Sequence, residues 1–142
     1  MNRMRRAMAG VVASTTALFV AACGGGSPAP APPPTPGARL YLANCMACHR
    51  ADGSGVPTLQ PSLAGTPVTV GDPTVLLDWV MYGRRPDALP AGTYSGFMPR
   101  FSYLSDEELA ALLTHVRASF GNRAAPVTPA MVAAARAAYR GS

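Results

Sequence analysis

Residues 38–49 read ARLYLANCMACH and end in a C-x-x-C-H sequence at residues 45–49. No Gly or Pro interrupts this stretch, so it predicts a helix. On a helix, Cys45 and Cys48 are three residues apart, and both sulfur atoms project from one face about a turn apart. This spacing suits two thioether bonds to the vinyl groups of one haem, and the adjoining His49 can then reach the iron from the same side.

Two other chemistries use closely spaced cysteines, and the rest of the chain argues against both. A dithiol redox site is expected in a thioredoxin-like βαβ context, and no stretch alternates at period two for long enough to predict a sheet. A zinc site commonly has four ligands, and no second C-x-x-C and no H-x-x-x-H is present. Haem attachment is therefore the interpretation that the sequence favours.

The charges are distributed so that the central part of the chain is neutral. The 142 residues include 12 basic and 7 acidic side chains; all the basic ones are Arg, and three of them lie in the first six residues. Residues 37–123 contain seven Arg and seven acids, so we expect no nucleic-acid partner. About 87 residues are few for a stable core built from side chains alone, so we expect this core to be held by an additional cross-link or bound group.

Residues 1–22 have a basic start and an apolar run too short to span a bilayer comfortably, which predicts a secretory signal. The small residues before Cys23 resemble the bacterial lipoprotein box, and this resemblance implies that Cys23 is lipidated and holds the protein at a membrane in the bacterial periplasm. Gly24, in place of Asp, favours the outer membrane by the same resemblance. The alternative is cleavage after Ala22 that leaves a free thiol, a liability in an oxidising compartment.

The remainder of the chain divides into three parts. Residues 23–36 are rich in Gly and then in Pro, which predicts a linker that is flexible at first and then stiff, and the lipoprotein resemblance implies that this linker is lipid-anchored. Residues 37–123 are the predicted domain. The Ala-rich tail at 124–142 could form one more helix on the surface.

Two further helices are predicted inside the domain, so the fold class is all-α. One starts at Pro73 with Asp72 as its N-cap and ends before Gly83. The other starts at a capping box of Ser105 and Glu108 and continues as an apolar stripe. The Gly- and Pro-rich stretches 50–72 and 84–104 are predicted to be loops.

Four features follow in a characteristic order: the C-x-x-C-H, the stretch DGSGVPTLQPSLAG at 52–65, the pair Met98-Pro99, and a last helix that begins LSDEELAALL. From Gly37 to Asn122 the chain thereby resembles class I cytochromes c, most of all the single-haem domains that serve as electron acceptors of periplasmic dehydrogenases. The resemblance implies a small cytochrome c fold of three or more helices around one covalently attached haem c. It also implies that the Pro61 carbonyl hydrogen-bonds His49 and that Leu63 packs on the ring.

The second axial ligand must come from the opposite side of the ring, and the candidates are Met46, Met81, Met98, Met131 and His115. Met46 lies inside the attachment motif, Met81 lies in mid-helix where core packing is commoner, and Met131 lies beyond the domain. His115 points off the Leu face of its helix. Met98 is left, in a Gly-rich loop where the following Pro favours an extended backbone, and the resemblance also places the axial Met at this Met-Pro pair.

Four side chains near the predicted site are candidate partners of the haem propionates: Trp79, Tyr94, and Arg84 or Arg85. Core packing or exposure to solvent is the competing interpretation for each of them.

His and Met ligation together leave no open position on the iron for a substrate. The sequence therefore predicts an electron-transfer protein and not an enzyme: a one-electron carrier in a bacterial periplasmic chain, with a dehydrogenase, oxidase or reductase as its redox partner. Two alternatives remain open. One is a haem enzyme or gas sensor in which Met98 does not bind the iron, and the other is a non-catalytic cytochrome subunit of a dehydrogenase complex.

Overall fold

The computed structural model describes residues 32–140. The predicted signal segment 1–22, the lipidation site Cys23 and the linker up to residue 31 lie outside the described residues. The described part is all-α, as predicted, and apart from one isolated bridge between Val56 and Gln60 it contains no β-structure. Its helices are α1 (Pro36–Asn44), α2 (Met46–His49), α3 (Pro67–Val70), α4 (Pro73–Tyr82), α5 (Asp106–Ala118) and α6 (Pro129–Arg140). None of the helices in residues 32–140 has the length and apolar character needed to cross a bilayer.

Helices α4 and α5 begin where the sequence predicts. The Asp72 side chain accepts a hydrogen bond from the N–H of Thr74 (2.8 Å), and Gly83 ends α4 in the left-handed conformation (φ 72°). At α5, Ser105 Oγ accepts from the N–H of Glu108 (3.1 Å), and the Glu108 carboxylate accepts from the N–H of Ser105 (2.9 Å). Both capping predictions are therefore confirmed.

The stretch 38–49 is not one unbroken helix, and this part of the prediction is wrong. Helix α1 starts earlier, at Pro36, because the Thr35 side chain caps it by accepting from the N–H of Ala38 (3.2 Å). At Cys45 the backbone leaves the helical path (φ −119°, ψ −34°), and the separate short helix α2 follows. The motif therefore stands at a junction between two helices.

The predicted loop 50–72 contains a helix that the sequence interpretation missed. Thr66 caps α3 by accepting from the N–H of Thr69 (3.2 Å), with Pro67 as the first helical residue. This is the same cap-plus-proline signal as at the start of α4. A single turn is too short for apolar periodicity to reveal it.

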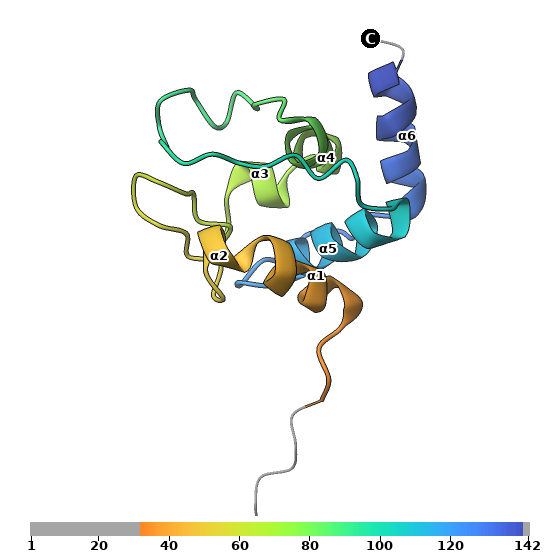
Figure 1. The fold of residues 1–142 in the computed structure, drawn as a ribbon, viewed down its shortest axis with the longest axis horizontal. Coiled ribbons are helices and arrows are strands. Elements are labelled where there is room, and N and C mark those ends of the chain that lie inside the picture. The colour runs from red at the N-terminus through yellow and green to blue at the C-terminus, as the bar shows by residue number, and fades with distance from the viewer. Residues whose placement is uncertain (1–31, 141–142) are drawn as a thin grey trace, which may run out of the picture. The chain divides into compact units, whose positions relative to one another are not determined.

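Helices α1 and α5 pack against each other and form the base of the core (Figure 1). They approach closely at Gly37, where any side chain would collide with the Ala111 carbonyl oxygen. Tyr41 of α1 and Leu109 and Leu112 of α5 are almost completely buried. The core shared by α1 and α5 thus fixes the start of the C-x-x-C-H segment relative to α5.

Helix α6, formed by the Ala-rich tail, packs on α4 and α5. Val132 is fully buried, and the Tyr139 ring stacks on the Tyr82 ring with 3.7 Å between centroids. Arg136 forms an ion pair with Asp106 (2.7 Å) at the start of α5. The tail therefore belongs to the same folded unit as the helices before it.

Two long loops extend on the side of this unit away from α6, and the second of them then runs back to the start of α5 beside α6, as Figure 1 shows. One connects α2 to α3, and the other connects α4 to α5. They are joined by main-chain hydrogen bonds, including one of 2.9 Å from the N–H of Ser95 to the carbonyl of Thr58.

Candidate haem site

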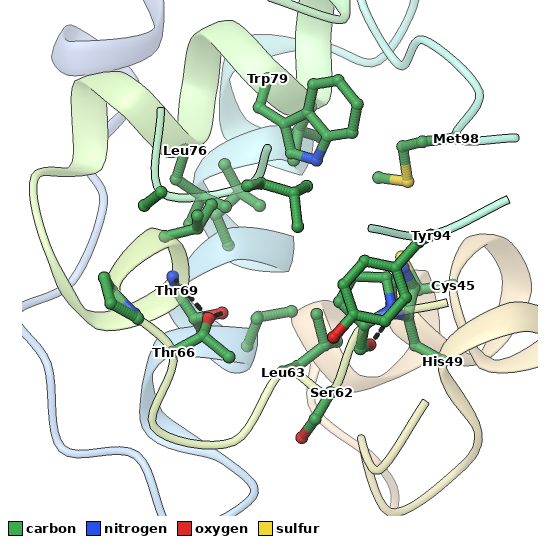
Figure 2. A pocket seen from close by; sticks show the side chains of 18 of the residues that line it. Cys45, His49, Ser62, Leu63, Thr66, Thr69, Leu76, Trp79, Tyr94 and Met98 are labelled. Atoms are coloured by element: carbon green, nitrogen blue, oxygen red, sulfur yellow. Dashed lines mark hydrogen bonds between the residues drawn. The ribbon is translucent and has the colours of Figure 1, made fainter. Parts of the chain in front are cut away.

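A cavity of about 240 Å³ lies among α2, α3, α4, α5 and the two long loops. Its walls are mainly aliphatic, and Figure 2 shows how these side chains surround the space together with those of Cys45, His49 and Met98. The aliphatic wall consists of Leu63, Val68, Leu76, Val80, Leu89, Leu112, Leu113 and Val116. A flat apolar cofactor is the kind of ligand that such a lining favours.

His49 lines this cavity, and its ring is held in one orientation. The residue is 5% exposed, and its Nδ1 atom lies 3.0 Å from the carbonyl oxygen of Pro61. Because a carbonyl can only accept, Nδ1 carries the proton and Nε2 keeps its lone pair. Burial lowers the pKa of His49, although the Pro61 carbonyl opposes this shift. The imidazole is therefore neutral near pH 7 and suited to bind a metal through Nε2.

The loop after the motif brings Pro61 under His49 by means of two glycines. Gly53 and Gly55 both have positive φ (69° and 70°), which L-residues with side chains seldom adopt. The N–H of Gly55 donates to the carbonyl of His49 (3.1 Å), and the N–H of Leu63 donates to the carbonyl of Gly53 (2.8 Å). A side chain at Gly55 would collide with the Pro61 carbonyl. The loop therefore needs glycine there to make the contact with His49.

One of the two cysteines, Cys45, borders the cavity, and neither Cys45 nor Cys48 forms a disulfide. Cys45 is half-buried and lines the cavity, whereas Cys48 is exposed. Burial, and secondarily the neighbouring Cys48, raises the pKa of the Cys45 thiol to about 11. A half-buried thiol with a raised pKa is poorly suited to dithiol redox chemistry, which depends on a thiolate.

Met98 is the one candidate for the second axial ligand that lines the cavity. In Figure 2 its side chain enters the cavity from the upper right, and Cys45 and His49 lie below it. Met81 is completely buried in the core, and Met46 is 38% exposed. Met131 packs against the core from α6. His115 lies beside Ser119, with 3.2 Å between its Nδ1 and the hydroxyl oxygen.

The candidate propionate partners fall into two groups. Arg85, Trp79 and Tyr94 line a small extension of the cavity, with the Arg85 guanidinium 5.1 Å from the Trp79 ring centroid. Gln60 also lines this extension and was missed, because nothing in its sequence context distinguishes it. Arg84 instead pairs with Asp78 (3.4 Å) and lies over the Tyr139 ring.

A family model for cytochrome c matches residues 34–119. The chain belongs to the cytochrome c family. It therefore binds one covalently attached haem c, and the apolar cavity beside Cys45, Cys48 and His49 fits that group. Residues 32–140 contain no group of three or more His, Cys, Asp or Glu placed to hold a metal ion.

Several curated relatives are cytochromes or cytochrome subunits of dehydrogenases. The chain is 40% identical over 90 residues to the cytochrome c subunit of alcohol dehydrogenase (quinone) from Gluconobacter oxydans, which covers 62% of the chain and 19% of that subunit. It is 36% identical over 104 residues to the gluconate 2-dehydrogenase cytochrome c subunit of Pantoea cypripedii, covering 70% of the chain and 24% of the subunit. The cytochrome c-552 of Thermus thermophilus is 35% identical over 91 residues, which is 61% of the chain and 69% of that protein.

The chain thus spans about a fifth of the length of the dehydrogenase subunits that it matches. It is similar to a segment of about 90 to 104 residues within them, and to most of the Thermus cytochrome. This is consistent with electron transfer, either as a carrier or as the cytochrome subunit of a dehydrogenase. Helix α6 lies beyond the residues that the family model matches.

Proposed function

We propose that this protein is a one-electron carrier in which His49 and Met98 ligate the iron of a haem c bound through Cys45 and Cys48. The observation that carries the proposal is the meeting of Cys45, His49 and Met98 at one apolar cavity, with His49 Nδ1 already engaged by Pro61. That engagement leaves Nε2 as the only ring nitrogen free to bind a metal.

The roles of the residues follow from their positions. Haem c, when bound, supplies a one-electron couple whose potential depends on the axial ligands. The Met98 thioether, a soft ligand, favours the reduced state, while the Pro61 carbonyl orients the His49 ring. The aliphatic wall keeps water away from the cofactor, and two protein ligands leave no position for a substrate.

A redox-titrated absorption spectrum of the purified holoprotein tests the ligation. We expect one reversible one-electron step and no change when carbon monoxide is added to the reduced protein. Met98→Ala should keep its covalent haem, titrate at a lower potential and bind carbon monoxide. Met131→Ala, the matched control on α6, should behave as wild type. Carbon monoxide binding by the wild type would instead favour a haem enzyme or gas sensor.

A second candidate function, the cytochrome subunit of a dehydrogenase, is favoured by the names of the relatives. In it the same electron step occurs, but the donor is bound permanently. Gentle purification from the native membrane separates the two functions. A stoichiometric dehydrogenase activity that co-purifies and survives gel filtration supports the subunit, whereas a lone cytochrome supports the carrier.

We also propose that the protein is anchored in the bacterial periplasm through a lipidated Cys23, with the outer membrane as the favoured site. Support comes from the apolar run before Cys23, the small residues at its end and Gly24 after it. The linker would then let the domain reach redox partners away from the lipid surface. Cys23→Ser should move the cytochrome from the membrane fraction to the soluble periplasmic fraction, while Ser27→Ala in the linker should leave it membrane-bound. A Cys23→Ser protein that stays in the membrane fraction would contradict the anchor.

A further inference from the structure

The two long loops beside the cavity contain a continuous run of uncharged residues each. Residues 53–71 and 88–99 include no Arg, Lys, Asp or Glu, so every charged side chain of the described part lies outside them. Both loops line the cavity, through residues such as Pro61, Tyr94 and Met98. The rim of the candidate haem site is therefore free of charge where residues 53–71 and 88–99 form it, whereas Arg85 of the second loop lines the small extension of the cavity.

Main-chain hydrogen bonds fasten the two loops to each other. The N–H of Ser95 donates to the carbonyl of Thr58, and the N–H of Gly96 donates to the carbonyl of Leu59, both at 2.9 Å. A side chain at Gly96 would collide with the Leu59 carbonyl oxygen, so the loops can approach this closely only with glycine there. The rim is thus held in place by its own backbone.

This fixed backbone presents two large apolar side chains to solvent. Phe97 is 79% exposed, although it lies between Gly96, which bonds the two loops together, and Met98, which lines the cavity. Leu59 is 48% exposed, although its own carbonyl accepts the hydrogen bond from Gly96. The Phe97 carbonyl accepts a hydrogen bond of 3.4 Å from Gln60 Nε2, so the backbone of Phe97 is also held. An exposed aromatic side chain on a hydrogen-bonded backbone beside a binding cavity is the kind of feature that marks a protein interaction site.

We propose that Leu59 and Phe97 form the surface on which a redox partner docks, and that the partner's own docking patch is apolar and uncharged. The inference rests on the proposed electron-carrier function. A partner with a charged docking patch would find no counter-charge within residues 53–71 and 88–99 and would lose hydration there without compensation. An uncharged apolar patch has no such hydration to lose, and binding is favoured by the apolar area of Phe97 that it buries.

The charges at the ends of the loops do not change this conclusion. They are of both signs: Arg50, Asp52, Asp72, Arg84, Arg85, Asp87 and Arg100. Mixed signs around an uncharged centre give little net steering, so complex formation should depend weakly on ionic strength.

Electron exchange between two copies of the holoprotein provides the test, because each copy presents an uncharged apolar face to the other. In a mixed sample, one electron leaves a reduced molecule and enters an oxidised one, and no bond is made or broken. The exchange rate is measured by nuclear magnetic resonance line broadening. For wild type we expect a rate that changes less than about twofold between about 10 and 500 mM NaCl.

Phe97→Glu places like charges on both docking faces and should slow the exchange by about tenfold or more at low salt, with partial recovery at high salt. Leu59→Glu is a second variant with the same expectation. Ala133→Glu adds the same charge at an exposed position of α6 and should exchange like wild type. Reversible titration at an unchanged potential in every variant shows that the electron-carrier function itself is intact.

Three results would overturn the docking surface. Exchange in Phe97→Glu and Leu59→Glu could equal wild type, wild-type exchange could depend steeply on salt, or Ala133→Glu could slow the exchange as much. A further experiment asks whether Cys23→Ser protein binds phosphatidylcholine vesicles. If it binds them, and if adding Phe97→Glu abolishes this binding while leaving the electron-exchange rate unchanged, the surface would be assigned to lipid instead. The redox titration is done before electron exchange is measured. If it showed no reversible one-electron step, the proposed electron-carrier function itself would be contradicted.

Discussion

Arg117 Nη1 donates a hydrogen bond of 2.9 Å to the carbonyl oxygen of Thr69, which joins the last turn of α5 to α3. The same atom donates to the Gly71 carbonyl (2.9 Å), and Nε donates to the Ala125 carbonyl (2.7 Å). Arg117 is only 2% exposed, and no carboxylate pairs with it among the described residues. A buried cation is thus balanced by backbone carbonyls from two segments distant in sequence, and one of those segments lines the cavity.

Replacing Arg117 should therefore destabilise the whole unit. In Arg117→Met three carbonyls lose their donor, and we expect the free energy of unfolding to fall by about 2–4 kcal/mol, since relief from burying the charge offsets part of the loss. Guanidinium titration of the holoprotein measures this change. Arg123→Met, on an exposed arginine, is the control and should stay within about 0.5 kcal/mol of wild type. Equal stability of the two variants would show that these hydrogen bonds contribute nothing net.

Gly55 tests the contact between Pro61 and His49. Gly55→Ala adds a methyl group against the Pro61 carbonyl at a positive φ, so the carbonyl must move away from Nδ1. Gly92→Ala is the matched control, because Gly92 also has positive φ (81°) but nothing lies near its Cβ position. The strain alone should cost about 1 kcal/mol in both, and the collision should add to it in Gly55→Ala.

The reduction potential distinguishes the two glycine variants further. A hydrogen bond from Nδ1–H makes the imidazole a stronger donor, which favours the oxidised metal. Weakening it in Gly55→Ala should raise the midpoint potential, whereas Gly92→Ala should keep the wild-type value. A shift of equal size in both variants would mean that the Pro61 carbonyl does not influence the metal ligand.

Tyr41 predicts how stability depends on alkaline pH. Its hydroxyl donates to the Arg50 carbonyl (2.6 Å), and burial, followed by the nearby Cys45 and Asp52, raises its pKa from 10 to about 12. The unfolded chain therefore releases this proton first. The contribution of Tyr41 to stability is complete below pH 10 and is lost as the pH rises from 10 through about 12.

Tyr41→Phe should cost about 1 kcal/mol at pH 7, because it removes one hydrogen bond. It should also lose less stability than wild type between pH 10 and 12. Denaturation of the reduced protein across this pH range measures both effects, with Tyr103→Phe as the control on an exposed tyrosine. An alkaline slope that Tyr41→Phe leaves unchanged would contradict the prediction.

The sequence predicts those features whose causes are local. The caps of α4 and α5 are readable because Asp72 and Ser105 act on backbone groups within three residues. The break at Cys45 and the docking of α6 depend on contacts with other elements, which no local pattern encodes. The structural role of Arg117 could not be predicted for the same reason, since the carbonyl groups that accept its hydrogen bonds lie 8 to 48 residues away in the sequence. The exposure of Phe97 likewise follows only once the two long loops are seen to be bonded to each other.

Helix α6 provides the last prediction, because it lies outside the residues matched by the family model yet is tied firmly to the domain. Arg136 donates from Nε to the Asp106 carboxylate and from Nη1 to the Ser102 carbonyl, both at 2.7 Å, and from Nη2 to the Leu104 carbonyl. Arg136→Met should lower the free energy of unfolding by about 1–3 kcal/mol and speed amide hydrogen exchange in α6.

Two controls apportion this effect. Asp106→Asn removes only the charge of the acceptor and should cost less than Arg136→Met, because both carbonyl acceptors remain. Arg140→Met, on the exposed last residue of α6, should stay within about 0.5 kcal/mol of wild type. If exchange in α6 were as fast in wild type as in Arg136→Met, the helix would open independently of the domain, and the ion pair could not be what holds it.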